Sequence, residues 1–180
     1  MRHLFEIALL SLLPLTARAS AIVIGFAGGL VARDNVVHGE VQLAERLRDA
    51  LSSQVQVRMF ENRHGEQAHR EVLRLLDTDH DGALSNSEKK NARIAIYGHS
   101  WGASEAVTLA RSLERDGIPV LLTVQVDSVQ KWGEDDGAIP SNVAQAANFF
   151  QLDGLLHGRT SHSRGGCVAH TNPRQCTVRI

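Results

Sequence analysis

A serine stands between two glycines in the stretch Gly98-His99-Ser100-Trp101-Gly102, which has the pattern G-x-S-x-G. An apolar run precedes this stretch and a helical pattern follows it, so we expect a sharp strand-to-helix turn with the serine at its tip. Side chains at the flanking positions would crowd such a turn, which explains the glycines. Amides at the start of the following helix would face an oxyanion formed beside the serine. Ser100 is therefore the candidate nucleophile.

A serine hydroxyl needs a general base, and the base needs an acid that orients it. Asp127 directly follows a predicted strand, so it would share a sheet edge with Ser100, and Asp153 is the alternative acid. The base is expected after the acid in the chain. The histidines found there are His157, His162 and His170. Chain order favours His162 and His170 equally, and His170 is taken as the candidate base.

Two backbone amides would stabilise the oxyanion. One is the N–H of Trp101, directly after the serine. The other is expected from the loop after the first strand, at Phe26 or Ala27, where neighbouring glycines allow a close approach. An ordinary glycine-rich turn is the alternative interpretation of this loop.

A second motif lies before the serine, where residues 77–88 read Asp-Thr-Asp-His-Asp-Gly-Ala-Leu-Ser-Asn-Ser-Glu. This pattern is typical of an EF-hand calcium loop, in which oxygen ligands alternate along the chain and a glycine makes the sharp turn. The expected ligands are Asp77, Asp79, Asp81, the carbonyl of Ala83, Ser85 and Glu88. The segment after the loop is too short for a full exit helix, so the motif predicts a single structural Ca²⁺ site. The alternative is a solvated acidic turn.

Apolar patterning predicts the elements that position these residues. Strands are expected at 21–25, 54–60, 93–97 and 120–126, and helices at 38–51, 67–76 and 103–115, with a last helix from Pro140 to Phe150. This alternation predicts an α/β protein with a three-layer, doubly wound, mainly parallel sheet. Ligands of such sheets bind beyond the carboxyl ends of the strands, where the glycine loop, Ser100 and Asp127 would meet.

Composition narrows the class of protein. The chain has 180 residues, 43% of them hydrophobic and 22% charged, which is typical of one soluble domain. A formal net charge of −1 and an aromatic content of 4% argue against nucleic acid as a partner.

The N-terminus has the layout of a secretory signal peptide. Arg2 and His3 precede an apolar run that ends near Leu15, and Ala17-Arg18-Ala19 follows as a cleavage site. The run is too short for a stable membrane span, although a buried N-terminal helix or a membrane anchor is the alternative. Cleavage near Ala19 would export the protein to a compartment that permits disulfides and supplies calcium.

With these motifs in place, the chain resembles the α/β-hydrolase superfamily, and more narrowly small secreted bacterial lipase- or thioesterase-like members with an EF-hand-type loop before the serine. The resemblance covers about Ala21 to Phe150, within a domain expected at 20–156. It implies Ser100 as nucleophile, Asp127 as acid, and a histidine after a further strand late in the chain. Residues 157–180 depart from it, because they hold four arginines, no acids and no apolar period. We therefore expect a poorly ordered tail and a domain shortened at its C-terminus. Cys167 and Cys176 in this tail are equally compatible with a disulfide and with two free thiols.

Two functions follow. The first is a secreted serine hydrolase, of esterase, lipase or thioesterase type, that binds Ca²⁺ and acts on a small-molecule acyl ester. The alternative is a calcium-binding protein on a hydrolase scaffold whose triad is incomplete. An exported interaction domain is a third, weaker interpretation. A working catalytic base would distinguish the first from the others.

Overall fold

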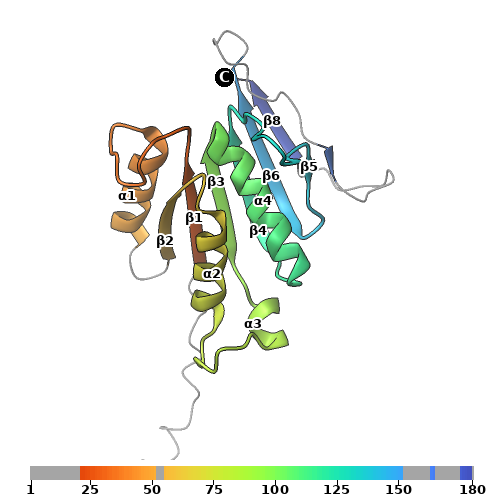
Figure 1. Cartoon of the computed structure of the whole chain (residues 1–180). Helices are drawn as coiled ribbons and strands as arrows, with labels where there is room; N and C mark the ends of the chain where they lie inside the picture. The colour runs from red at the N-terminus through yellow and green to blue at the C-terminus, as the bar shows by residue number, and fades with distance from the viewer. Residues whose placement is uncertain (1–20, 52–54, 152–162, 165–174, 180) are drawn as a thin grey trace, which may run out of the picture.

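The computed structural model describes residues 21–51, 55–151, 163–164 and 175–179, and six parallel strands form its main sheet. The strands are β1 (Ala21–Ala27), β2 (Val55–Glu61), β3 (Ile94–His99), β4 (Val120–Val126), β6 (Val143–Phe150) and β8 (Gln175–Arg179). Their order across the sheet is β2-β1-β3-β4-β6-β8 (Figure 1). A separate two-stranded parallel ladder joins β5 (Ala138–Ile139) to β7 (Ser163–Arg164).

Helices lie on both faces of the sheet. The helices are α1 (Gly39–Leu51), α2 (Gly65–Leu76), the short α3 (Asn86–Lys90) and α4 (Trp101–Arg115). Alternate residues of β1 and β3 join two different apolar clusters: one packs against α2 and α4, and the other against α1. Fully buried side chains such as Leu113 and Val107 in α4 each contribute roughly 1.5–3 kcal/mol to stability. The predicted α/β class with helices on both faces of a mainly parallel sheet is confirmed.

The two faces are covered unequally. On the first face, α2 and α4 extend from β1 to β6. On the second face, α1 packs over β1 and β2, and it is the only helix of the described residues that lies there. Figure 1 shows α1 at one side of the sheet, with β4 and β6 far from it. On that face Tyr97 of β3 is buried beside α1, whereas β4 carries side chains that no described helix covers.

The predicted last helix is wrong, because Val143–Phe150 forms strand β6 between β4 and β8. Its apolar residues happen to fall at helical spacing, and the surrounding sheet overrides that weak preference. Ser141, read as a helix start, instead binds α4: its N–H and its hydroxyl both donate to Glu114 Oε1, at 2.7 and 2.6 Å.

The C-terminal segment adds a second difference. No strand was predicted after residue 157, yet β8 pairs with β6 in parallel and extends the sheet. Within the described part of the chain, no helix combines the length and the apolar character that a membrane span requires. The predicted signal peptide at 1–19 and Cys167 lie outside the described residues.

Candidate functional site

Ser100 occupies the sharp turn between β3 and α4. Its backbone angles are φ 54° and ψ −121°, a conformation that residues other than glycine rarely adopt. Such strain persists only where the surroundings hold it. Here the Ser100 N–H donates to the carbonyl of Val126 at 2.9 Å, and the Ser100 carbonyl accepts from Val129 N–H at 3.3 Å. The serine is thus fixed to the end of β4, at the carboxyl edge of the sheet.

The flanking glycines are required because backbone packs against backbone at this turn. A Cβ atom on Gly98 would overlap the carbonyl group of Gly102. A Cβ atom on Gly102 would lie 2.8 Å from the carbonyl carbon of Phe26 and 2.9 Å from the carbonyl oxygen of Ala27. The turn therefore rests directly on the last residues of β1, which brings the loop after β1 to the serine.

That loop begins two residues later than predicted. Phe26 lies inside β1, paired with Phe60 and Gly98, and its buried ring packs against Phe60 with 6.2 Å between centroids. Pairing on both sides extends the strand past the expected end. The residue beside the serine is instead Gly28, where a Cβ atom would lie 3.3 Å from the Cβ of Ser100. The Gly28 N–H donates to Glu40 Oε1 at 3.2 Å.

Trp101 is the first residue of α4, and the first amides of a helix have no acceptor within it. Its N–H is thus placed as an oxyanion donor should be, directly after the serine. The oxyanion roles of Trp101 and Phe26 stay predictions.

Asp127 lies at the same sheet edge as Ser100. It follows β4 with φ 45°, and its N–H donates to the carbonyl of Phe149 at 2.8 Å. Its Oδ1 accepts from the N–H of Gln151 at 2.7 Å. The carboxylate therefore holds the chain where it leaves β6. The alternative acid, Asp153, lies outside the described residues.

The candidate histidines for the catalytic base are not among the residues that the structure describes. His157, His162 and His170 all lie outside the described ranges. Of the described histidines, His69 binds Asp116 Oδ2 at 2.5 Å, and His64 lies 3.9 Å from Glu61 Oε2. His38 and His99 line one hollow on the sheet face that carries α1. From the sequence, only His99 could be expected near the serine, because it directly precedes Ser100. No sequence pattern indicates that His38 lies in the same hollow.

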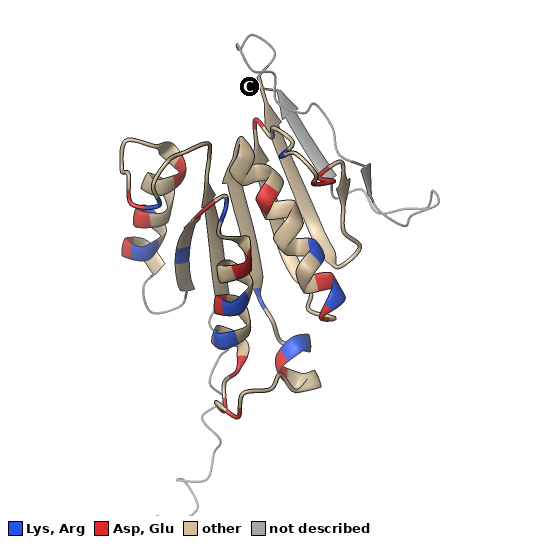
Figure 2. Cartoon of the chain, viewed as in Figure 1, with Lys and Arg blue, Asp and Glu red and all other residues tan. Residues whose placement is uncertain are grey.

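The acidic loop lies between α2 and α3, before β3, and Figure 2 shows its acidic residues gathered there. One carboxylate oxygen from each of Asp77, Asp79 and Asp81 lies within 4.8 Å of the others. The turn is held by two amides: Gly82 N–H donates to Asp77 Oδ2 at 3.1 Å and Ala83 N–H donates to Asp81 Oδ1 at 2.8 Å. The structure therefore brings the first three predicted ligands together.

The last predicted ligand, Glu88, is engaged elsewhere. Its carboxylate accepts from the backbone N–H groups of Thr78 (2.6 Å) and Ser85 (2.9 Å) and from both of their hydroxyls. The backbone hydrogen bonds from Thr78 and Ser85 lower the pKa of Glu88 to about 2. Ser85 also caps α3 by accepting from the Glu88 N–H, which completes a capping box. Ser85 and Glu88 thus close the loop without joining the three aspartates.

A buried ion network on α4 was not predicted. Glu105, one turn into α4, pairs with Lys131, whose ammonium also binds Glu134 Oε1 at 2.8 Å and the carbonyl of Asn62 at 2.9 Å. Burial raises the pKa of the Glu105 carboxyl. The network ties the loop after Asp127 to α4 and to the end of β2. No local pattern could reveal it, because Glu105 and Lys131 are 26 residues apart.

No protein-family model and no curated protein matches the chain. Among solved structures, it is similar to RedJ, described with a polyethylene glycol molecule in its active site. The identity is 12% and the TM-score 0.48, over 77% of this chain and 71% of RedJ.

The chain is also similar to a hyperthermophilic esterase from the archaeon Pyrobaculum calidifontis. The identity is 13% and the TM-score 0.48, over 75% of this chain and 57% of the esterase. For the ester hydrolase EH1AB1 from the Lake Arreo metagenome, the identity is 17% and the TM-score 0.40, over 68% of this chain and 39% of the hydrolase. The solved structures to which the chain is similar therefore include esterases and an α/β hydrolase.

Proposed function

We propose that the protein is a serine hydrolase that cleaves acyl esters or thioesters. The observation that carries this proposal is Ser100 held at φ 54° on a strand-to-helix turn. The turn lies where the ends of β1 and β4 converge. A strained serine at the carboxyl edge of a parallel sheet supports the role of nucleophile, since ligands of such sheets bind at that edge.

In the proposed reaction, Ser100 Oγ attacks the acyl carbonyl carbon while a histidine takes its proton. The resulting oxyanion accepts hydrogen bonds from Trp101 N–H and from an amide at the end of β1, assigned to Phe26 or its neighbours. The tetrahedral intermediate then expels the alcohol or thiol, which receives the proton from the histidine. Water repeats these steps on the acyl-enzyme, which releases a carboxylic acid and regenerates the serine. Asp127 would orient the histidine, with His170 or His162 in that role.

We expect a fluorophosphonate probe to label the purified protein and to lose essentially all labelling in Ser100→Ala. The reagent needs an activated serine, so labelling reports a working base. Gel fluorescence and intact-mass measurement would follow the reaction. Ser87→Ala, at an exposed position in α3, is the matched control and should label like the natural sequence.

Variants at 127, 162 and 170 would then assign the acid and the base. The candidate histidine is the one whose replacement by alanine lowers the labelling rate by about 10²-fold or more. Absence of labelling in folded protein would overturn the hydrolase proposal and leave calcium binding as the function.

We propose further that the acidic loop binds Ca²⁺ through Asp77, Asp79, Asp81 and the Ala83 carbonyl, and that Ser85 and Glu88 join them when the cation replaces their hydrogen bonds within the loop. Oxygen ligands of this kind fit a hard cation. Asp77 supplies separate support, because its Oδ1 is buried and has no hydrogen-bond partner. A buried carboxylate oxygen without a donor is costly unless a cation meets it. The cation would neutralise the mutual repulsion of the three aspartates and support the loop.

Calcium is expected to raise the melting temperature by several degrees and to bind with a single-site isotherm in calorimetry. Asp79→Asn should weaken binding by about tenfold or more, because it removes one anionic ligand. Glu45→Gln, at an exposed position in α1, is the control and should leave the isotherm unchanged. Equal melting curves with calcium and with chelator would contradict the proposal.

We also propose that residues 1–19 act as an export signal with cleavage near Ala19. The support is the charged start, the apolar run and the Ala-x-Ala site. Export would place the acidic loop where calcium is plentiful. N-terminal sequencing of protein from the cell exterior or periplasm should give a chain that begins at Ser20.

A further inference from the structure

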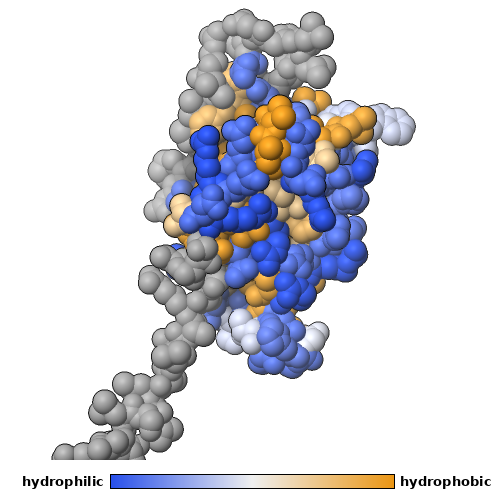
Figure 3. Space-filling model, turned by 90° about the vertical axis from the view of Figure 1, so that its left-hand side faces the viewer, coloured by the Kyte–Doolittle hydropathy of each residue, from blue (hydrophilic) through white to orange (hydrophobic). Residues whose placement is uncertain are grey.

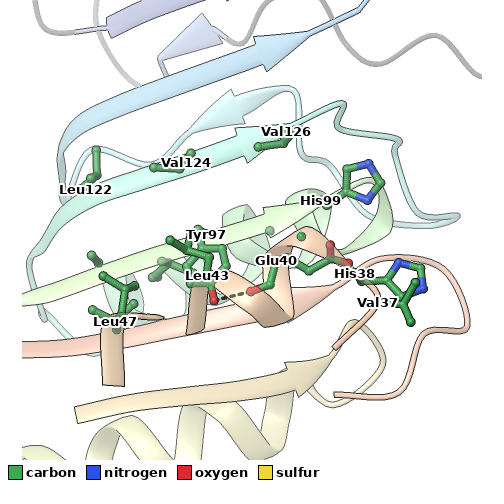
Figure 4. Close-up of a pocket in the computed structure, with 15 residues that line it drawn as sticks. Val37, His38, Glu40, Leu43, Leu47, Tyr97, His99, Leu122, Val124 and Val126 are labelled. Carbon is green, nitrogen blue, oxygen red and sulfur yellow. Dashed lines mark hydrogen bonds between the residues drawn. The ribbon is translucent and has the colours of Figure 1, made fainter. Parts of the chain in front are cut away.

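An apolar groove lies on the face of the sheet that α1 covers only in part, and its volume is about 740 Å³. Leu43 and Leu47 of α1 form one wall, and Leu122, Val124 and Val126 of β4 form the other (Figure 4). The floor is β3 with Tyr97. This volume lies within the roughly 300–1,000 Å³ that is typical of small-molecule sites.

The middle of the groove offers a ligand little polarity. Tyr97 is the polar side chain there, and its hydroxyl already donates to the carbonyl of Glu40 at 2.8 Å. The remaining lining at this depth is aliphatic. A ligand segment that lies here therefore has to be apolar, because a buried polar group without a partner would be penalised.

One end of the groove differs in character. His38, Glu40 and His99 gather at the end toward the carboxyl edge of the sheet, as Figure 4 shows. Exposed Val37 extends the apolar surface there. Figure 3, which views the molecule from the α1 side, shows hydrophobic surface at the upper end of this side. The groove thus has an apolar stem and, toward the carboxyl edge of the sheet, a mouth that carries ionisable side chains.

The mouth is adjacent to the nucleophile. Gly98 and His99, which line the groove, lead directly into Ser100. On the other side, Glu40 Oε1 accepts from the Gly28 N–H at 3.2 Å, and a Cβ on Gly28 would lie 3.3 Å from the Cβ of Ser100. A molecule with its apolar tail in the stem would therefore hold its polar head beside the serine.

We infer that the groove binds the linear aliphatic acyl chain of the substrate, along β3 and β4 beside α1, with the carbonyl group at Ser100. The inference rests on the proposed hydrolase function and names its substrate class. An apolar helix or a second copy of the chain fits less well, because either would remove the partly exposed imidazoles of His38 and His99 from water. An amphiphile keeps its polar end there and its tail in the stem.

The test uses the full chain with Ser100→Ala, so that binding is measured without turnover. The fluorescent fatty acid cis-parinaric acid is titrated into the protein, and unlabelled alkanoates of 6 to 14 carbons compete with it. Each added methylene should tighten binding by about fourfold until the stem is filled. The affinity should stop increasing at a definite chain length. An unspecific apolar surface would not produce such a limit.

A matched pair of leucines tests the location. Leu43 lies in the groove and Leu121 outside it, and each is 43% exposed, so the chain should fold with glutamine at either position. Leu43→Gln should weaken parinaric acid binding by at least fivefold, whereas Leu121→Gln should leave it unchanged. Equal effects of both variants, or affinities that do not depend on chain length, would overturn the inference.

Three further outcomes separate the possible failures. A dimer in sedimentation that Leu43→Gln dissociates would make the groove an interface between copies, and the inference would be wrong. Chain-length-dependent binding in a protein that fluorophosphonate does not label would keep the acyl groove and reject the hydrolase. Labelling of Ser100 without fatty-acid binding would keep the hydrolase and reject the groove.

Discussion

Gly102→Ala is expected to lower the free energy of unfolding by about 3 kcal/mol or more. The new Cβ would lie 2.8 Å from the carbonyl carbon of Phe26 and 2.9 Å from the carbonyl oxygen of Ala27. Both neighbours are backbone atoms of β1, an inner strand paired on both sides, so neither can turn away. The helix would have to move from the sheet, and the serine with it.

Urea denaturation would measure this loss as a lower midpoint with an unchanged slope. Gly39→Ala is the matched control, since the space around a Cβ at the start of α1 is open. It should be neutral or slightly stabilising, because alanine restricts the unfolded chain. A similar loss of unfolding free energy in both variants would mean that the close contact between α4 and β1 is not what requires glycine at position 102.

Lys131→Met is expected to destabilise the fold by about 3 kcal/mol at neutral pH, because it leaves Glu105 buried and unpaired. The side chain of Glu105 is 7% exposed and that of Lys131 is 20% exposed, so water replaces the lost partner poorly. The double variant Glu105→Gln/Lys131→Met removes the uncompensated charge and should recover much of the loss. Thermal or urea unfolding would measure both.

The stability lost in Lys131→Met should also depend on pH. Burial raises the pKa of Glu105 above its ordinary value of 4.5, and removal of the lysine takes away the charge that opposes this rise. A group whose pKa is higher in the folded than in the unfolded state stabilises the folded state at pH values below its unfolded-state pKa. This contribution disappears as the pH rises through its folded-state pKa. The difference between Lys131→Met and the natural sequence should therefore be smallest at low pH and grow toward pH 7. A difference that does not change with pH would exclude Glu105 as its origin.

The sequence predicted the elements that have strong local signals. Apolar runs that end in glycine or aspartate gave the positions of β3 and β4, and helical spacing gave α2 and α4. The turn at Ser100 followed from its glycines, which backbone contacts require. Val143–Phe150 could not be assigned in this way, because its spacing suits a helix and only the neighbouring strands make it β6.

Features made by residues far apart in the chain could not be predicted. The pair of Glu105 and Lys131 and the contact of Glu40 with Gly28 depend on how loops fold over the sheet edge. The apolar groove depends on how far α1 reaches across the sheet. This helix covers β1, β2 and Tyr97 of β3, and no other described helix covers that face of β4. Periodicity reports which face of an element is apolar, but not what lies against it.

The acidic loop enters β3 at its amino end, whereas Ser100 leaves the same strand at its carboxyl end. Six strand residues separate the two, or about 20 Å at the usual rise per residue. A cation in the loop is thus too far from the serine to polarise a bond or shift a proton. It can act only by stabilising the chain that leads into β3, the strand between β1 and β4. Calcium would then set what fraction of the molecules is folded, and not how fast each folded molecule reacts.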